Sequence, residues 1–300
     1  MNDTTKLLVS SSISSSWQDY LTLCKPKVVL MLLVTALIGM QLAQPTPPSF
    51  MTVIWAGLGI TLAASAAAVI NHILDIHLDK KMHRTKHRPM VKRRITQSKA
   101  LTFSAILLVL SMGILLVKIN WVTAILTLVG FVGYAGFYTM YLKYKTPQNI
   151  VYGGIAGALP PLLGWTSVTG NIELGGVVLT LIVFLWTPAH FWPLAIDRVE
   201  DYRAARVPML PVVKGESHTK NAVLIYLILT IFASFLPYFI GMASHYYLAA
   251  SVMLAIWFLI YGLRLKFGSE HKIAIRTFFV SIYYLLGIFM ALLIDNFFSL

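Results

Sequence analysis

The feature that most constrains this chain is a series of apolar runs of about 18 residues or more, separated by short polar segments. A helix of about 20 residues crosses the hydrocarbon core of a bilayer, so runs of this length predict transmembrane helices. We place nine of them, at roughly 26–43, 51–74, 100–117, 121–142, 150–168, 174–196, 221–243, 247–265 and 274–294. The sequence therefore predicts an all-α integral membrane protein with nine transmembrane helices.

Composition leaves little room for a separate soluble domain. Hydrophobic residues make up 58% of the 300 residues, and charged residues only 12%. We expect a single transmembrane domain over residues 17–300. Residues 1–16 are rich in Ser and Thr and lack the apolar core of a cleaved signal, so we expect a disordered cytoplasmic tail there.

The basic residues predict the orientation. All but one of the 24 Lys and Arg residues lie on alternate loops, and the exception is Lys118. The positive-inside rule places these loops and the amino terminus in the cytoplasm and the carboxyl terminus outside. The net charge of +13 is thus mainly a topological signal, and we expect the lipid bilayer and no nucleic acid as a partner. The single cysteine excludes an intramolecular disulfide and a cysteine-based metal site.

A first polar motif lies at the end of the second predicted span. Asn71, Asp75 and Asp79 are four residues apart, so on one helix they lie about 40° and 80° round from one another. Two carboxylates on one face repel each other, and near a helix C-terminus the helix dipole also disfavours them. We therefore expect a cation here, and a hard divalent metal bound to phosphate is the leading candidate.

A second acidic group ends the sixth predicted span and consists of Asp197, Glu200 and Asp201. It follows the first motif by four spans, which suggests two pseudo-repeated four-helix units plus a ninth helix. Both groups lie at cytoplasmic helix ends, where they would suit magnesium ions that keep water and phosphate as ligands. The alternative is that the carboxylates only cap the membrane edge and pair with the basic loops, although an ordinary cap there would use Lys or Arg.

Further polar residues fit the same chemistry. Arg84 and Arg88 follow the first motif and could make bidentate contacts with phosphate, or serve only as positive-inside anchors. Weaker candidates on the next cytoplasmic loop are Lys143, Lys145 and Asn149. His190 lies two turns before Asp197 on the same helical face. It either points into the same cavity or is a packing residue.

The ordered set of motifs resembles the intramembrane UbiA-type prenyltransferase superfamily. The paired aspartate motifs are Asn71-x3-Asp75-x3-Asp79 and Asp197-x3-Asp201-Tyr202. Other segments resemble the protohaem-farnesylating branch of that superfamily: Tyr20-Leu-Thr-Leu-Cys-Lys-Pro-Lys27, Met82-x-Arg84-Thr85-x-x-Arg88-Pro89, Thr146-Pro-Gln-Asn149-Ile-Val-Tyr-Gly-Gly154, Ala158-Leu-Pro-Pro-Leu-Leu-Gly-Trp165, Thr187-Pro-Ala-His190-Phe-Trp192 and Asp201-Tyr-Arg-Ala-Ala205-x-x-Pro208-Met-Leu-Pro211. Asp197 departs from that branch, in which this position is often not acidic.

The resemblance implies Mg²⁺-assisted transfer of a farnesyl group from farnesyl diphosphate to a vinyl carbon of protohaem (haem B), giving haem O. It implies that Asn71, Asp75 and Asp79 hold one magnesium–diphosphate unit and that Asp197 and Asp201, beside Tyr202, hold a second. Arg84 and Arg88 would contact the diphosphate, and His190 could ligate or orient the haem iron. It also implies a multi-pass location in the cell inner membrane, a cytoplasmic active site, and haem A synthase or terminal oxidase assembly factors as partners.

Three other functions remain open from the sequence. A prenyltransferase acting on a quinone precursor or an aromatic acid shares the aspartate motifs but not the additional segments. A multi-helix transporter also has internal repeats, but its site would lie near the midplane on broken helices. A non-catalytic assembly factor for a terminal oxidase gives no reason for two aspartate groups.

Overall fold

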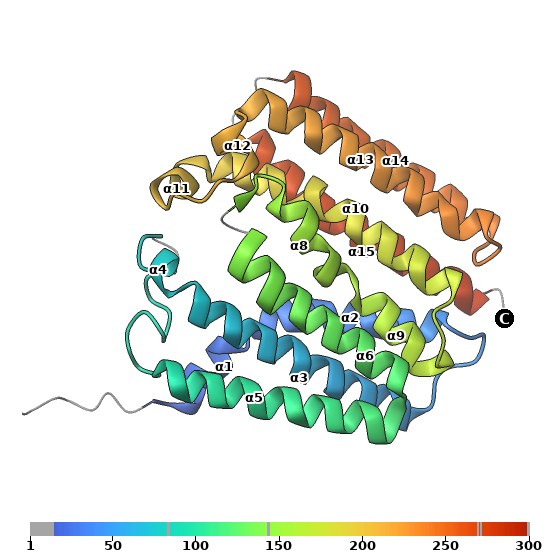
Figure 1. The fold of residues 1–300 in the computed structure, drawn as a ribbon. Coiled ribbons are helices and arrows are strands. Elements are labelled where there is room, and N and C mark those ends of the chain that lie inside the picture. The colour runs from blue at the N-terminus through green and yellow to red at the C-terminus, as the bar shows by residue number, and fades with distance from the viewer. Residues whose placement is uncertain (1–14, 83–84, 143–144, 269, 271, 299–300) are drawn as a thin grey trace, which may run out of the picture.

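The computed structural model describes residues 15–82, 85–142, 145–268, 270 and 272–298, and the regular elements within these ranges are all helices. Nearly all of the predicted tail, together with the candidate residues Arg84 and Lys143, lies outside them. Figure 1 shows the helices packed as one elongated bundle. In chain order they are α1 (Trp17–Leu23), α2 (Pro26–Leu42), α3 (Phe50–Leu74), α4 (Ile76–Asp79), α5 (Gln97–Ile114), η2 (Leu115–Ile119), α6 (Trp121–Phe131), η3 (Val132–Leu142), α8 (Asn149–Ala158), α9 (Pro160–Thr169), α10 (Leu174–Asp197), α11 (Val199–Ala204), α12 (Leu210–Val213), α13 (Glu216–Phe239), α14 (His245–Phe267) and α15 (Ile273–Phe298).

Most of the predicted spans correspond to long apolar helices. Within the described residues, seven helices are long and apolar enough to cross a membrane, and their outer faces carry many exposed large hydrophobic side chains. Helices α1 and α2 together also pass this test, but they meet at a bend of 52°. They form an eighth candidate if the bent pair counts as one span. The predicted run at 150–168 instead contains two ten-residue helices, α8 and α9. Their junction lies at Pro160, the first residue of α9, whose ring nitrogen has no hydrogen to donate to a backbone hydrogen bond.

Two glycines allow α2 and α9 to touch along their backbones. A Cβ added to Gly39 would lie 2.1 Å from the carbonyl oxygen of Pro161, and one added to Gly164 would lie 1.9 Å from that of Ala36. Neither approach leaves room for a side chain. The small residues thus explain how α9 docks closely against α2, as small residues do in membrane helix pairs.

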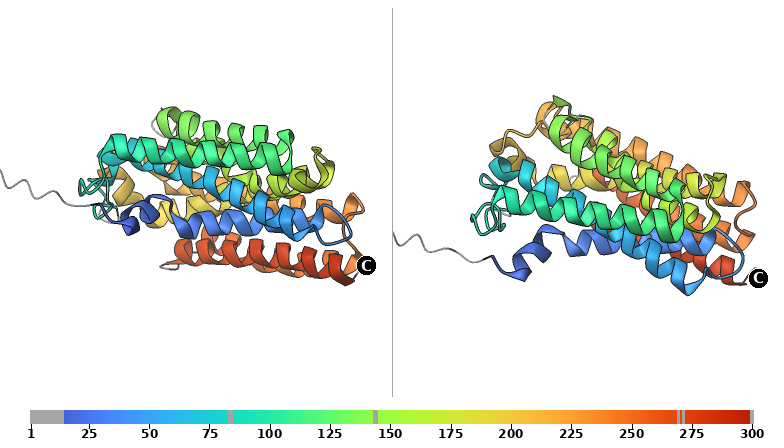
Figure 2. Two further views of the ribbon diagram at one scale, coloured as in Figure 1. Left: turned by 90° about the horizontal axis from the view of Figure 1, so that it is seen from below. Right: turned by 60° about the horizontal axis from the view of Figure 1, so that its bottom comes forward.

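The bundle places the two polar motifs at one end. Helix α10 packs against α13, α15, α8 and α9, whereas α3 packs against α5, α2 and the π-helical segments η2 and η3. The turns that follow α3 and α10 emerge at the same end of the bundle as α1, and the carboxyl-terminal end of α15 lies at the opposite end (Figures 1 and 2).

Candidate functional site

The first motif forms a buried polar corner where α3 ends. Asn71, Asp75 and Asp79 are each only 4% exposed. Helix α3 stops at Leu74, and Asp75 has φ −84° and ψ 0°, so the short α4 is a separate turn. The expectation of one uninterrupted helix is therefore wrong in detail. The helical hydrogen-bond spacing persists across the break, from Asp75 N to Asn71 O (3.0 Å) and from Asp79 N to Asp75 O (2.8 Å), which keeps the three side chains close together.

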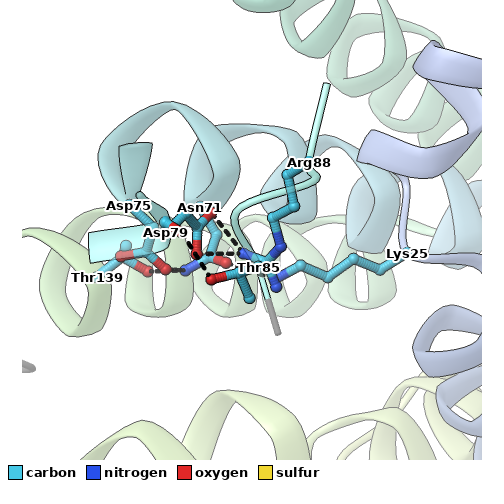
Figure 3. A network of polar contacts seen from close by, with 7 residues as sticks. All are labelled: Lys25, Asn71, Asp75, Asp79, Thr85, Arg88 and Thr139. Atoms are coloured by element: carbon cyan, nitrogen blue, oxygen red, sulfur yellow. Dashed lines mark hydrogen bonds and ion pairs between the residues drawn. The ribbon is translucent and has the colours of Figure 1, made fainter. Parts of the chain in front are cut away.

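Asn71 has the polar partners that its depth in an apolar helix requires. Its Oδ1 accepts a hydrogen bond from the ammonium group of Lys25, and its Nδ2 donates to Asp75 Oδ2 at 3.0 Å. Nδ2 also lies 3.5 Å from Thr139 Oγ1, a long contact (Figure 3). Thr139 belongs to the π-helical segment η3, and its hydroxyl donates to the carbonyl of Tyr134 five residues earlier. Buried amides need such partners, since an unsatisfied one costs about 1–3 kcal/mol.

Asp79 is neutralised by the chain itself. Arg88 Nη1 lies 2.9 Å from Asp79 Oδ1 and 2.7 Å from Oδ2, and the two side chains are 20% and 5% exposed. Thr85 donates its hydroxyl to the backbone carbonyl of Asp79 at 3.1 Å, which folds the basic loop back over the motif. The cation expected beside the carboxylates is present in part as Arg88 and, through Asn71, as Lys25.

The second motif is more open to solvent. Asp197 is the last residue of α10, and its Oδ2 lies 3.2 Å from the Nε of Arg198, with side chains 27% and 57% exposed. Asp201 is half-buried on α11, a helix with no buried residue, and Tyr202 beside it is also half-buried. Glu200 pairs with Arg203 at 2.5 Å on the surface.

The two motifs lie at the same end of the bundle but do not merge. Among the described residues there is no group of three or more His, Cys, Asp or Glu side chains that could hold a metal ion. Each motif offers at most two predicted carboxylate ligands: Asp75 with Asp79, and Asp197 with Asp201. This donor set fits Mg²⁺, which binds proteins through one or two carboxylates and takes water and substrate phosphate as its other ligands.

Of the candidates on the next loop, one is exposed and one is buried. The Lys145 ammonium lies 4.6 Å from the ring centroid of Tyr141 and is exposed, so it is accessible to an anion. Asn149 is the first residue of α8 and is fully buried.

His190 sits in an aromatic stack. Its ring lies between Trp186, with centroids 4.2 Å apart, and Phe278, with centroids 4.4 Å apart. Its Nδ1 lies 2.7 Å from the hydroxyl of Ser281, and the residue is 7% exposed. These contacts are those of a packing histidine with a satisfied ring nitrogen, and they favour the packing alternative over a haem ligand.

Sequence reasoning missed Lys25, Thr85 and Thr139 as parts of the site. Lys25 and Thr85 each stand in a segment that carries the family resemblance, but no spacing rule connects Lys25 with a residue 46 positions later. Thr139 carries no local signal, because an isolated Thr in an apolar helix is common.

Comparison with known families identifies the chain as an intramembrane prenyltransferase. The chain matches the UbiA prenyltransferase family over residues 32–292 and belongs to that family. Family membership and the long apolar helices together make it a multi-pass membrane protein.

The chain is similar along nearly its whole length to curated relatives. It is 48% identical over 282 residues to the protoheme IX farnesyltransferase of Marinobacter nauticus, covering 94% of this chain and 93% of the relative. It is 50% identical over 282 residues to protoheme IX farnesyltransferase 2 of Pseudoalteromonas atlantica, covering 94% and 92%.

Solved structures agree with the fold. A digeranylgeranylglyceryl phosphate synthase superposes with a TM-score of 0.79 at 21% identity, covering 93% of this chain and 98% of that one. A UbiA homologue from Archaeoglobus fulgidus bound to GPP and Mg²⁺ superposes with a TM-score of 0.65 at 16% identity, covering 91% and 99%. Identities this low establish the shared architecture alone.

Proposed function

We propose that this protein transfers the farnesyl group of farnesyl diphosphate to a vinyl carbon of protohaem IX with addition of water, forming haem O. The proposal rests on sequence identity: the chain is 48% and 50% identical to two protoheme IX farnesyltransferases over 94% of its length. The buried Asn71–Asp75–Asp79 corner supports it, because its carboxylates and the neighbouring Arg88 are the groups that a metal–diphosphate requires.

The chain's residues would act mainly on the leaving diphosphate. Bound Mg²⁺ would supply Lewis-acid stabilisation of its developing charge, held by Asp75 and Asp79 in one motif and by Asp197 and Asp201 in the other. Arg84, Arg88 and the exposed Lys145 would contact phosphate oxygens, with Lys143 adding charge on the same loop. Each well-placed cation would lower the barrier by about 3 kcal/mol, the scale of a preorganised electrostatic contact. Asn149 and Tyr202 would contact substrate near these loops.

The reaction balances without a side chain acting as a general base. The bond between farnesyl C1 and the diphosphate oxygen breaks, and the leaving group keeps the electron pair. The haem vinyl group forms the new carbon–carbon bond, water adds to the resulting cation beside the porphyrin, and that water loses one proton. His190 is stacked between Trp186 and Phe278 and its Nδ1 lies 2.7 Å from the Ser281 hydroxyl, so we assign it to packing.

The same proposal includes the membrane arrangement. We infer nine spans, with α8 and α9 crossing together as one, and a cytoplasmic amino terminus followed by one domain over residues 17–300. The basic loops support this orientation because their described parts lie at the end of the bundle that carries both motifs (Figure 1). The active site would then face the cytoplasm from the inner membrane, where haem A synthase or oxidase assembly factors could receive the product.

Substrate choice tests the proposal. Purified protein with Mg²⁺ and farnesyl diphosphate should release diphosphate much faster when protohaem is added than when an aromatic acid or a quinone precursor is added. Faster release with the aromatic acceptor would instead assign the chain to quinone-type chemistry. No release with any acceptor would contradict a prenyltransferase role.

A further inference from the structure

Lys25 stands in a backbone conformation that needs an explanation. It has φ 51° and ψ 59°, the left-handed region, which residues with a side chain seldom adopt. It lies at the 52° bend between α1 and α2, directly before Pro26. A glycine would take this conformation without strain, so the bend by itself gives no reason for a lysine at this position.

That side chain reaches the buried corner. The Lys25 ammonium donates to Oδ1 of Asn71, a residue 46 positions later on α3 (Figure 3). The Asn71 Nδ2 in turn donates to Asp75 Oδ2 at 3.0 Å. A chain of two hydrogen bonds therefore connects the Lys25 ammonium, the Asn71 amide and the carboxylate of Asp75, the first predicted metal ligand.

The three partners of the amide agree on a single orientation. If the amide rotated by 180°, its oxygen would face the Asp75 carboxylate and its N–H groups would face an ammonium. Thr139 also favours the observed orientation, because its hydroxyl hydrogen is directed to the Tyr134 carbonyl and its oxygen can only accept from Asn71. Of these contacts, that of Lys25 is the one made to the amide oxygen.

We propose that Lys25 is a positioning residue, which fixes the Asn71 amide so that its N–H groups hold Asp75 oriented for metal–diphosphate binding. This rests on the proposed function, in which Asp75 is a metal ligand. The left-handed backbone at the bend between α1 and α2 directs the Lys25 side chain toward the end of α3, where its ammonium reaches Asn71. Lys25 acts through Asn71 and needs no contact with the reacting atoms.

Four variants separate the ammonium from the backbone. Lys25→Met removes the charge and keeps the stem, whereas Lys25→Gly also removes the charge but accepts the left-handed backbone. Lys25→Arg keeps a cation, and Lys27→Met removes a charge two residues away on an exposed position. Binding of inorganic diphosphate with Mg²⁺ to the detergent-solubilised full chain, measured by calorimetry alongside Tm, gives a readout that does not depend on turnover.

We expect Lys25→Met and Lys25→Gly each to weaken binding about tenfold, or about 1.4 kcal/mol. Lys25→Arg should retain part of the affinity, and Lys27→Met should match the wild type. In the Asn71→Ala background, Lys25→Met should have little further effect on binding, because Lys25 acts through the Asn71 amide.

Three results would overturn the positioning role. They are wild-type affinity in Lys25→Met, wild-type affinity in Lys25→Gly, or losses from Lys25→Met and Asn71→Ala that add fully. If the wild-type chain itself bound no diphosphate with Mg²⁺, the proposed function would fail and this inference with it. A wild type that binds while Lys25→Met binds equally well would remove this inference alone.

Discussion

One guanidinium nitrogen of Arg88 lies within 2.9 Å of both carboxylate oxygens of Asp79. The two residues were expected as a phosphate contact and a metal ligand, and the structure makes them partners of each other. In the proposed function Asp79 ligates Mg²⁺ and Arg88 contacts the diphosphate, so we expect Arg88 to exchange the carboxylate for the incoming diphosphate. This exchange keeps the buried corner electrically balanced, because the metal replaces the arginine as the cation beside Asp79.

Replacing Arg88 with Met should destabilise the protein by about 1–3 kcal/mol, because Asp79 would be left buried without its cation. Adding Mg²⁺ should then raise the Tm of Arg88→Met more than that of the wild type, since no arginine competes with the metal. Thermal unfolding in detergent with and without Mg²⁺ measures both effects. Arg203→Met is the matched control, because it removes an arginine from an exposed pair with Glu200 and should change stability by less than about 1 kcal/mol. A variant with wild-type Tm and no added response to Mg²⁺ would contradict the exchange.

Replacing Asp75 with Asn should slow farnesyl transfer by about 10²–10³-fold, the scale expected for losing a preorganised electrostatic group. The shape of the side chain is kept while its charge is lost. Asp197→Asn should have a smaller effect, because Asp197 is 27% exposed and already lies 3.2 Å from the Nε of Arg198. Steady-state rates of diphosphate release compare the two. Equal rate losses in Asp75→Asn and Asp197→Asn would contradict the expectation that the buried motif contributes more to catalysis than the exposed one.

Sequence patterns predicted the carboxylate corner but not the groups that surround it. The four-residue spacing of Asn71, Asp75 and Asp79 and their place at a helix end required a cation beside the carboxylates. Neither Lys25 nor Thr139 could be identified, because their contacts depend on a left-handed bend and on the π-helical widening of η3. The break at Asp75 could not be predicted from helical periodicity either, because backbone hydrogen bonds with four-residue spacing continue across it.

The apolar runs predicted most spans and left their internal breaks unresolved. Hydropathy alone cannot separate one long helix from α8 followed by α9, which meet at Pro160. The contact between α2 and α9 depends on Gly39 and Gly164, which lie 125 residues apart in sequence. Spacing along one helix carries no information about such a pairing.

Replacing Gly164 with Ala should destabilise the bundle by about 1–3 kcal/mol, because the new methyl group would overlap the backbone of α2. The control is Gly113→Ala on α5, where a Cβ meets nothing within 4 Å. That change should leave stability unchanged or raise it slightly, since Ala favours helix more than Gly. Tm values of the two variants in one detergent give the comparison. A Gly164→Ala protein as stable as Gly113→Ala would mean that α2 and α9 are not in backbone contact.

Asp295 provides a test of stability far from the proposed site. It is 6% exposed near the end of α15, and it accepts hydrogen bonds from the backbone N–H groups of Ser244 (2.7 Å) and Tyr247 (3.2 Å) and from the Ser244 hydroxyl. It thereby caps the start of α14. Asp295→Ala should lower stability by about 1–3 kcal/mol and leave diphosphate affinity unchanged. A loss of affinity at unchanged Tm would contradict this separation between the two ends of the bundle.

The mass of haem after incubation with purified protein, farnesyl diphosphate and Mg²⁺ is the measurement that reports farnesyl transfer itself. Wild-type protein should add one farnesyl group and one hydroxyl group, taken from water, to protohaem and release one diphosphate, and the Asp75→Asn variant should largely lose this activity. Haem of unchanged mass after incubation with folded wild-type protein, farnesyl diphosphate and Mg²⁺ would contradict the proposed function.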